Sequence, residues 1–277
     1  MTQTPFFPQD AHQCGPAALA TVMQAQGVKV TPAALTEEVY LPQREGSLQI
    51  EMVAATRRHG LLPYVLAPDL SEVFSQINAG RPVLVLQNQG VSWYPQWHYA
   101  VIIGYDLQDG KIILRSGAIK RYVMRLTTFE RTWQRSHYWA MVVLKPGELP
   151  AHPDAQRYLE AIVGFEQTHA WSLLDTLYRT GLQRWPGDKE LRMGYGNALY
   201  LQQQAAAAAE QYQRVLEQHP EFAPAHNNLA MALAQEGDFA QALAHARHAI
   251  HLGGEHEAEY RSTLSEIQQM QAARLSR

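Results

Sequence analysis

The segment Gln9-Asp-Ala-His-Gln-Cys14-Gly-Pro-Ala-Ala-Leu-Ala20 holds the one cysteine of the 277 residues at a point where a loop enters a helix. A mostly apolar stretch runs on to Met23, which predicts a buried helix with Pro16 in its first turn. The positive end of a helix dipole and its unpaired N–H groups favour a thiolate, the nucleophilic form of cysteine. Two interpretations of Cys14 follow: a catalytic nucleophile, or a buried structural cysteine at a helix end.

A cysteine nucleophile requires a base, and His98 has the most suitable context among the four histidines of residues 1–150. It lies in Trp97-His98-Tyr-Ala-Val-Ile-Ile-Gly104-Tyr-Asp106, which predicts an apolar strand that holds the imidazole at the rim of a cleft. A strand-end histidine bonded to backbone is the alternative. His12 is too close to the cysteine in sequence to be well oriented, His59 ends a helix, and His137 is expected at the surface.

In the rest of the first half, segments with a helical pattern come before segments with the pattern of strands. Further helices are predicted to begin near Thr31, Ser47 and Leu70. The predicted strands are Pro82–Gln87, Tyr99–Tyr105, Lys111–Arg115, Tyr122–Leu126 and Tyr138–Leu144, with a hairpin signal at Asp109-Gly110. Helices followed by an antiparallel sheet predict an α+β domain.

The second half of the chain differs from the first in amino-acid composition and contains an internal repeat. Pro186 and Pro220 are 34 residues apart, and the same step again reaches Gly254, which is the tetratricopeptide period. Two clear repeats and one degenerate one, followed by a capping helix over 255–270, resemble an all-α tetratricopeptide array. The turn-rich segment 145–153 serves as the predicted linker, giving domains at 1–147 and 153–277.

Residues 5–145 resemble the papain-like cysteine peptidases of the bacteriocin-processing (double-glycine leader peptidase) type. The resemblance rests on Gln9, then Cys14-Gly-Pro at a helix start, then His98-Tyr-Ala-Val on a strand, in that order. It implies that Cys14 is the nucleophile and that His98 is the general base that later protonates the leaving amine. It also implies that the Gln9 amide and the backbone N–H of Cys14 stabilise the oxyanion; Gln13 is the competing assignment.

The third catalytic position departs from the family pattern. The family commonly places an Asp or Asn on the next strand, 16–18 residues after the histidine, and here Ser116 occupies that place. A serine oxygen accepts the imidazole N–H but carries no charge, so it stabilises an imidazolium less than a carboxylate does. Asp106 is the next candidate, although a turn role before Asp109 fits it better.

The resemblance therefore implies a hydrolase that cleaves peptide bonds through a Cys–His thioester, with a peptide or protein substrate and a protein partner recruited by the repeats. A catalytically weak peptidase-like scaffold is the second hypothesis, favoured by Ser116, and acyl transfer to an amine is a third. The aromatic residues Trp93, Tyr94 and Trp97 before His98 form either a substrate wall or packing for a long loop.

Composition excludes several other classes. A net charge of −3 argues against nucleic-acid binding, and no apolar run is long enough to predict an integral membrane segment. One cysteine forms no internal disulfide, and Met1–Pro8 lacks the pattern of a signal peptide. No cofactor is expected, and His245, His248 and His251, spaced by three, lack the carboxylate or cysteine support of a metal site. The resemblance favours the cell envelope or periplasm, with the cytoplasm as the alternative.

Overall fold

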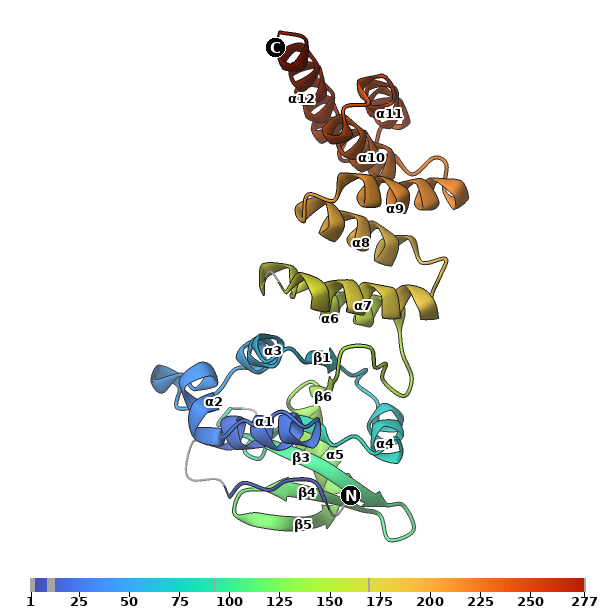
Figure 1. The fold of residues 1–277 in the computed structure, drawn as a ribbon. Helices are drawn as coiled ribbons and strands as arrows, with labels where there is room; N and C mark the ends of the chain where they lie inside the picture. The colour runs from blue at the N-terminus through green and yellow to red at the C-terminus, as the bar shows by residue number, and fades with distance from the viewer. Residues whose placement is uncertain (1–2, 9–12, 92, 169, 277) are drawn as a thin grey trace. The chain divides into compact units, whose positions relative to one another are not determined.

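The computed structural model describes residues 3–8, 13–91, 93–168 and 170–276. The chain divides into two compact units, Met1–Thr168 and His169–Arg277. The first unit combines helices with a sheet, and the second is helical (Figure 1).

The first unit is an α+β domain with one six-stranded antiparallel sheet. Its helical elements are α1 (Cys14–Ala25), α2 (Pro32–Val39), the 3₁₀ turn η1 (Pro42–Arg44), α3 (Gln49–Arg58), α4 (Leu70–Asn78), α5 (Leu126–Gln134), α6 (Ala155–Val163) and the 3₁₀ turn η2 (Glu166–Thr168). Its strands are β1 (Leu62–Val65), β2 (Val83–Asn88), β3 (Trp97–Asp106), β4 (Lys111–Ser116), β5 (Ile119–Arg125) and β6 (Ala140–Leu144). The strand order across the sheet is β1-β6-β2-β3-β4-β5.

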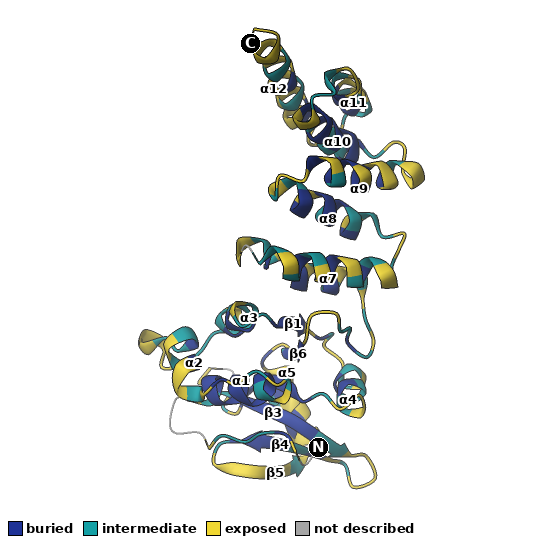
Figure 2. Cartoon of the chain, viewed as in Figure 1, coloured by how far each residue is buried: buried dark blue, intermediate teal, exposed yellow. Residues whose placement is uncertain are grey.

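Helix α1 forms the centre of the hydrophobic core. Its residues Gly15–Met23 are all buried, and the apolar ones share a core cluster with Leu86, Tyr99 and Val101 of the sheet. Helix α1 therefore lies against β3. In Figure 2 helix α1 is dark blue, the colour of buried residues, along most of its length. Burial on most of its faces explains why the segment is largely apolar rather than amphipathic. This packing places the N-terminus of α1, with Cys14, beside the start of β3.

The structure confirms the predicted fold class, but β1 precedes α4 and α5 lies between β5 and β6, so the predicted order of helices followed by strands holds only in outline. Besides the two 3₁₀ turns, the short strand β1 and the helix α5 of the first unit were absent from the sequence prediction. Strand β1 contains Pro63 and spans four residues, and its pairing with the distant β6 has no local signal. Helix α5 begins directly where β5 ends, without a side-chain cap or a separating turn residue.

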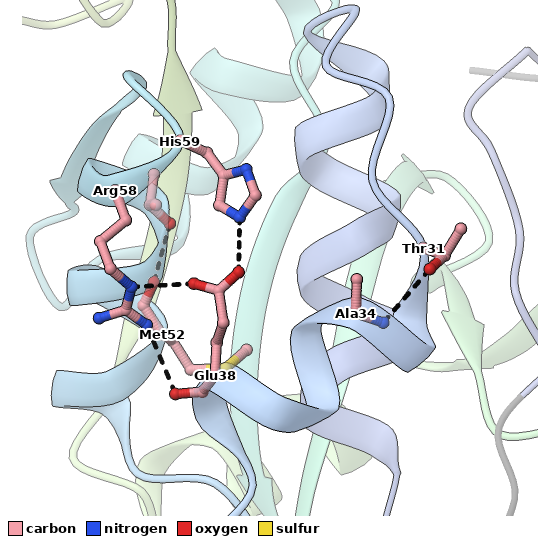
Figure 3. A network of polar contacts seen from close by, with 7 residues as sticks. Thr31, Ala34, Glu38, Met52, Arg58 and His59 are labelled. Carbon is pink, nitrogen blue, oxygen red and sulfur yellow. Dashed lines mark hydrogen bonds and ion pairs between the residues drawn. The ribbon is translucent and has the colours of Figure 1, made fainter.

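An ion-pair network joins α2 to α3 (Figure 3). The Glu38 carboxylate accepts hydrogen bonds from Arg58 Nε at 2.9 Å and from His59 Nε2 at 2.8 Å. Although burial opposes its charge, these two partners hold the pKa of Glu38 below its ordinary value. At the other end of α2, Thr31 Oγ1 accepts from the backbone N–H of Ala34 as a helix cap. The network secures α3, whose preceding residues form one wall of the cleft described below.

Helix α6 belongs to the first unit although it follows the predicted linker. The Tyr64 hydroxyl of β1 accepts from the backbone N–H of Asp154 at 3.2 Å. Arg57 donates to the backbone carbonyls of Glu160 and Ala161 near the C-terminus of α6, both at 3.3 Å. Positive charge is favourable at that end of a helix. The first compact unit therefore includes α6 and extends to Thr168, while the domain boundaries at 147 and 153 stay a prediction.

The second unit consists of antiparallel helices with the predicted repeat. They are α7 (Trp171–Arg184), α8 (Lys189–Leu201), α9 (Ala205–Gln218), α10 (Ala223–Glu236), α11 (Phe239–Leu252) and α12 (Glu257–Leu275). Helices α8 and α10 begin 34 residues apart, as the proline spacing predicts. Small residues such as Ala208, Ala230 and Ala242 are buried where neighbouring helices pack. The tetratricopeptide prediction is confirmed.

Candidate active site

Cys14 is the first residue of α1, and its thiol contacts the backbone of β3. Three backbone N–H groups, those of Tyr99, Gly15 and Cys14 itself, act on the sulfur and favour its charged form. Burial outweighs them and raises the pKa of the Cys14 thiol above its ordinary value. Burial therefore opposes the thiolate that the start of the helix was expected to favour.

The residue after the cysteine has to be a glycine because another segment of the chain passes directly over it. A Cβ added to Gly15 would lie 2.5 Å from Ser47 Oγ and 2.8 Å from Ser47 Cβ. Tyr99 strengthens this contact, since its hydroxyl donates to the Ser47 carbonyl oxygen at 3.2 Å. The start of α1, the segment before α3 and the start of β3 therefore meet around the cysteine.

His98 is the second residue of β3, and its imidazole pairs with Ser116. The two are joined by a hydrogen bond of 2.8 Å between His98 Nε2 and Ser116 Oγ. Burial lowers the pKa of the His98 imidazole, so the ring is neutral at rest. When Nε2 donates its proton to Ser116, Nδ1 carries the lone pair and is the nitrogen that can accept a proton from a nucleophile.

The register of the sheet explains why a residue 18 positions away reaches the histidine. Strands β3 and β4 pair with Val101 opposite Arg115 and Ile102 opposite Leu114. Continued by one step, this register sets Ser116 opposite Ala100, diagonal to His98 and on the same face of the sheet. The structure thus brings together the histidine and the serine that the sequence singled out.

A cleft of about 930 Å³ connects the cysteine and the histidine. It is lined by Cys14, by residues 44–49, by residues 94–99, and by Leu86 and Gly117. Tyr94 and Trp97 are 64% and 53% exposed, so these rings form an apolar wall that is open to solvent rather than internal packing for the loop. A concave site with apolar walls and a few polar groups is typical of a ligand-binding site.

The loop that carries these aromatic rings is held in place by Asn88. The buried Asn88 side chain accepts from the backbone N–H groups of Gly90 and Gln96, both at 2.9 Å. Arg135 adds a hydrogen bond of 2.6 Å to the Gly90 carbonyl. Sequence analysis missed Asn88 and Ser47, because neither belongs to a motif and both act through contacts that only the folded chain creates.

The remaining candidates are placed differently. Gln9 lies outside the described residues. Gln13 precedes α1 with its side chain exposed and without a capping hydrogen bond. Asp106 lies at the far end of β3 from His98 and accepts from the backbone N–H of Asp109 at 3.0 Å, so it is a turn residue. Ser116 is therefore the orienting candidate that the structure brings to the imidazole.

Histidines also gather in the second unit, between α10 and α11. His226 Nε2 donates to the Pro220 carbonyl at 2.9 Å, and His226 Nδ1 lies 2.8 Å from His245 Nδ1. The His248 ring packs edge-on against His226. Within the described ranges, no group of three histidine, cysteine or acidic side chains has an arrangement that could hold a metal ion. These rings serve helix packing.

An antiparallel α+β core with a cysteine at the head of its central helix and a histidine on the adjoining strand defines a papain-like peptidase fold. The Peptidase_C39 like family model matches residues 1–141, and the chain belongs to this family. A tetratricopeptide repeat model matches residues 176–220 and 202–256. No curated protein matches the chain. Among the described helices none is both long and apolar enough to cross a membrane.

Several solved structures are similar to the first half of the chain. The peptidase domain of ComA from Streptococcus, a bifunctional ABC transporter involved in a quorum-sensing pathway, is 22% identical, with 52% of this chain and 99% of that chain covered and a TM-score of 0.42. A C39-like peptidase from Bacillus anthracis is 17% identical, with 52% and 96% covered and a TM-score of 0.44. A double-glycine motif protease from an AMS/PCAT transporter, in complex with the leader peptide, is 18% identical, with 51% and 91% covered and a TM-score of 0.39.

Proposed function

We propose that the chain is a cysteine peptidase that hydrolyses peptide bonds through a thioester, and that its repeats recruit a substrate or a partner protein. The observation that carries the proposal is that Cys14 and His98 line one open cleft while Ser116 Oγ lies 2.8 Å from Nε2 of the imidazole. Membership of the Peptidase_C39 like family supports the same activity.

Two neutral groups can perform this chemistry if the proton moves as the bond forms. Cys14 Sγ attacks the scissile carbonyl carbon while His98 Nδ1 accepts the thiol proton. The carbonyl oxygen becomes an oxyanion near the backbone N–H of Cys14, with the Gln9 amide as the proposed second donor. The C–N bond then breaks, His98 returns the proton to the leaving amine, and a thioester remains. Water, deprotonated by His98, attacks the thioester and releases the acid and the thiol.

Ser116 has a positioning role in this scheme. By accepting from His98 Nε2 it holds the ring with Nδ1 free, and it partly stabilises the transient imidazolium. A neutral hydrogen bond of this kind contributes about 0.5–1.5 kcal/mol, less than a carboxylate would. The second candidate function, a peptidase-like scaffold with little turnover, is favoured by this neutral partner and by the raised pKa of Cys14.

Turnover measurements on matched variants distinguish the peptidase from the scaffold. A proteome-derived peptide library is incubated with the wild-type chain, with Cys14→Ser and with His98→Ala, and new termini are counted by mass spectrometry. We expect cleavage by the wild type and none by either variant, with melting temperatures nearly unchanged. His152→Ala, in which a 63% exposed side chain is removed, is the matched control and should cleave like the wild type. Cleavage by His98→Ala at the wild-type rate would refute the catalytic assignment, and no cleavage by the wild type would favour the scaffold.

A further inference from the structure

Strand β5 (Ile119–Arg125) is the last strand of the sheet, and one side of its backbone is open. The sheet order ends in β4-β5, and among the described residues β5 pairs with β4 alone. Figure 2 shows β5 mostly in yellow, the colour of exposed residues. An unpaired strand edge presents N–H and C=O groups to which another chain can add a strand.

The register with β4 shows which backbone groups of β5 face outward. The backbone N–H of Leu126, directly after the strand, donates to the Gly110 carbonyl at 2.8 Å, so this residue turns its backbone toward β4. In an antiparallel pair that direction alternates from one residue to the next, and the register is regular over residues 122–125. The N–H and C=O groups of Val123 and Arg125 are therefore directed to the open edge.

Positive charge gathers along this edge. The stretch 106–135, which runs from the end of β3 to the end of α5, contains seven Lys and Arg and three Asp and Glu, although the whole chain has a net charge of −3. Of these cations Lys120, Arg121 and Arg125 lie on β5, and all three are exposed. Within the described part of the chain no carboxylate comes within ion-pair distance of them.

The three acidic residues of the same stretch do not neutralise the edge. Asp109 forms an ion pair with Lys111 Nζ at 2.6 Å. Asp106 accepts the backbone N–H of Asp109 in the turn between β3 and β4. Glu130 lies on α5, where the exposed Arg131 follows it directly. The cations of β5 therefore remain available to a group from outside the chain.

These charges discriminate between the strands that could add to the edge. A second copy of β5 would bring its own Lys120, Arg121 and Arg125 to the same place, and like charges opposite each other in a strand pair are destabilising. A strand with carboxylates at those positions gains from the same geometry. The edge therefore disfavours self-association and favours an acidic strand.

We propose that β5 is a docking edge for an extended acidic segment of a partner protein, which joins the six-stranded sheet antiparallel to β5. Hydrogen bonds to the backbone of Val123 and Arg125 hold the segment, and its carboxylates face the cations of β5. The strand begins two residues after Gly117, which lines the cleft that contains Cys14, so the segment docks beside one wall of that cleft. The proposal does not depend on Cys14 chemistry, because binding can be measured without the cysteine.

The test uses the full-length Cys14→Ser chain and a fluorescein-labelled peptide, Glu-Thr-Glu-Thr-Val-Thr-Glu, with binding followed by fluorescence anisotropy at low salt. We expect saturable binding that weakens as salt is added. Two control peptides should bind about tenfold more weakly or worse: one with glutamine in place of every glutamate, and one that is N-methylated along its backbone and keeps its charges. Hydrogen exchange of residues 119–125 should slow when the acidic peptide is bound, because outward N–H groups become paired.

Substitutions in the chain separate the edge from general charge effects. Arg121→Glu should raise the Kd about tenfold, whereas Arg247→Glu, at an exposed position on α11, changes the net charge equally and should leave it within about twofold. Val123→Pro removes an outward N–H without removing a bond to β4, and should weaken binding severalfold relative to Val123→Ala. Circular dichroism checks that each variant is folded.

Several results would overturn the proposal. Equal Kd values for Arg121→Glu and Arg247→Glu would show that the peptide does not bind at β5. Equal binding of the N-methylated peptide, or unchanged hydrogen exchange in 119–125, would show attraction between charges without strand pairing. Binding to phosphatidylglycerol vesicles that is lost in Arg121→Glu, together with no binding of the acidic peptide, would assign the edge to a membrane surface instead.

Discussion

Replacing Ser116 by aspartate places a negative charge beside the imidazole of His98. The present oxygen lies 2.8 Å from His98 Nε2, so a carboxylate there would lie about 3–4 Å from the charge of an imidazolium. At an effective dielectric constant of about 20 their attraction is roughly 4 kcal/mol, and desolvation of a carboxylate in this buried position offsets part of it. Opposite charges this close shift a pKa by about 1–3 units, or roughly 1.4–4 kcal/mol.

The shift has a defined sign at both members of the pair. Burial lowers the pKa of His98 and raises that of Cys14 in the wild-type chain, so the neutral pair dominates at pH 7. In Ser116→Asp the histidine pKa rises by about 1–3 units and the thiolate–imidazolium pair gains population. The pH at which the thiol becomes reactive should fall by a comparable amount.

Alkylation by iodoacetamide measures this directly, because Cys14 is the chain's one cysteine and every adduct reports on it. The rate is followed from pH 5 to 10 for the wild type, Ser116→Asp and Ser116→Asn. The asparagine variant reproduces the shape of aspartate without its charge and should follow the wild-type profile. Superimposable profiles for wild type and Ser116→Asp would refute the reasoning, since a charge in contact with His98 has to appear in the titration of its partner.

Two further perturbations test the support of the site. Glu38→Gln should lower the free energy of unfolding at pH 7 by about 1 kcal/mol, because it removes the negative charge and one of the two acceptor oxygens that Arg58 and His59 contact. The folded-state pKa of Glu38 is depressed, so its contribution is complete above the unfolded-state value and disappears as pH falls through the folded-state value. In urea titrations the stabilities of the two chains should therefore converge as the pH falls through the folded-state pKa of Glu38, and an unchanged gap in acid would contradict this account. A chain shortened after Thr168 should unfold cooperatively, whereas one ending at Pro150 should lose several kcal/mol with the buried side chains of α6, as measured by the same titration.

Much of the fold could be predicted because its signals are local. The segment after Cys14 is mostly apolar, as a buried central helix requires. The strand that begins near His98 is an apolar run that ends before clear turn residues. The 34-residue period of the second half needs no knowledge of contacts between distant residues. The outline of the element order followed from these patterns.

What escaped prediction depends on contacts between residues far apart in sequence. Ser47 passes over Gly15 and β1 pairs with β6, and no pattern of single residues encodes either contact. The direction in which the pKa of Cys14 is shifted could not be predicted for a related reason. A helix N-terminus favours a thiolate, but burial by β3 and its neighbours dominates, and the depth of burial is a property of the assembled core.

The place of β6 in the sheet has a consequence for how this protein is made. The last strand in sequence lies between β1 and β2, so those two strands have no partner on their facing edges until residues 140–144 arrive. A chain that emerges from the ribosome therefore cannot close the sheet behind α1 until nearly all of the first unit is synthesised. The thiol at the head of α1 rests on that sheet through Tyr99. The surroundings of Cys14 are therefore complete only when a segment more than 120 residues further along the chain has joined the sheet.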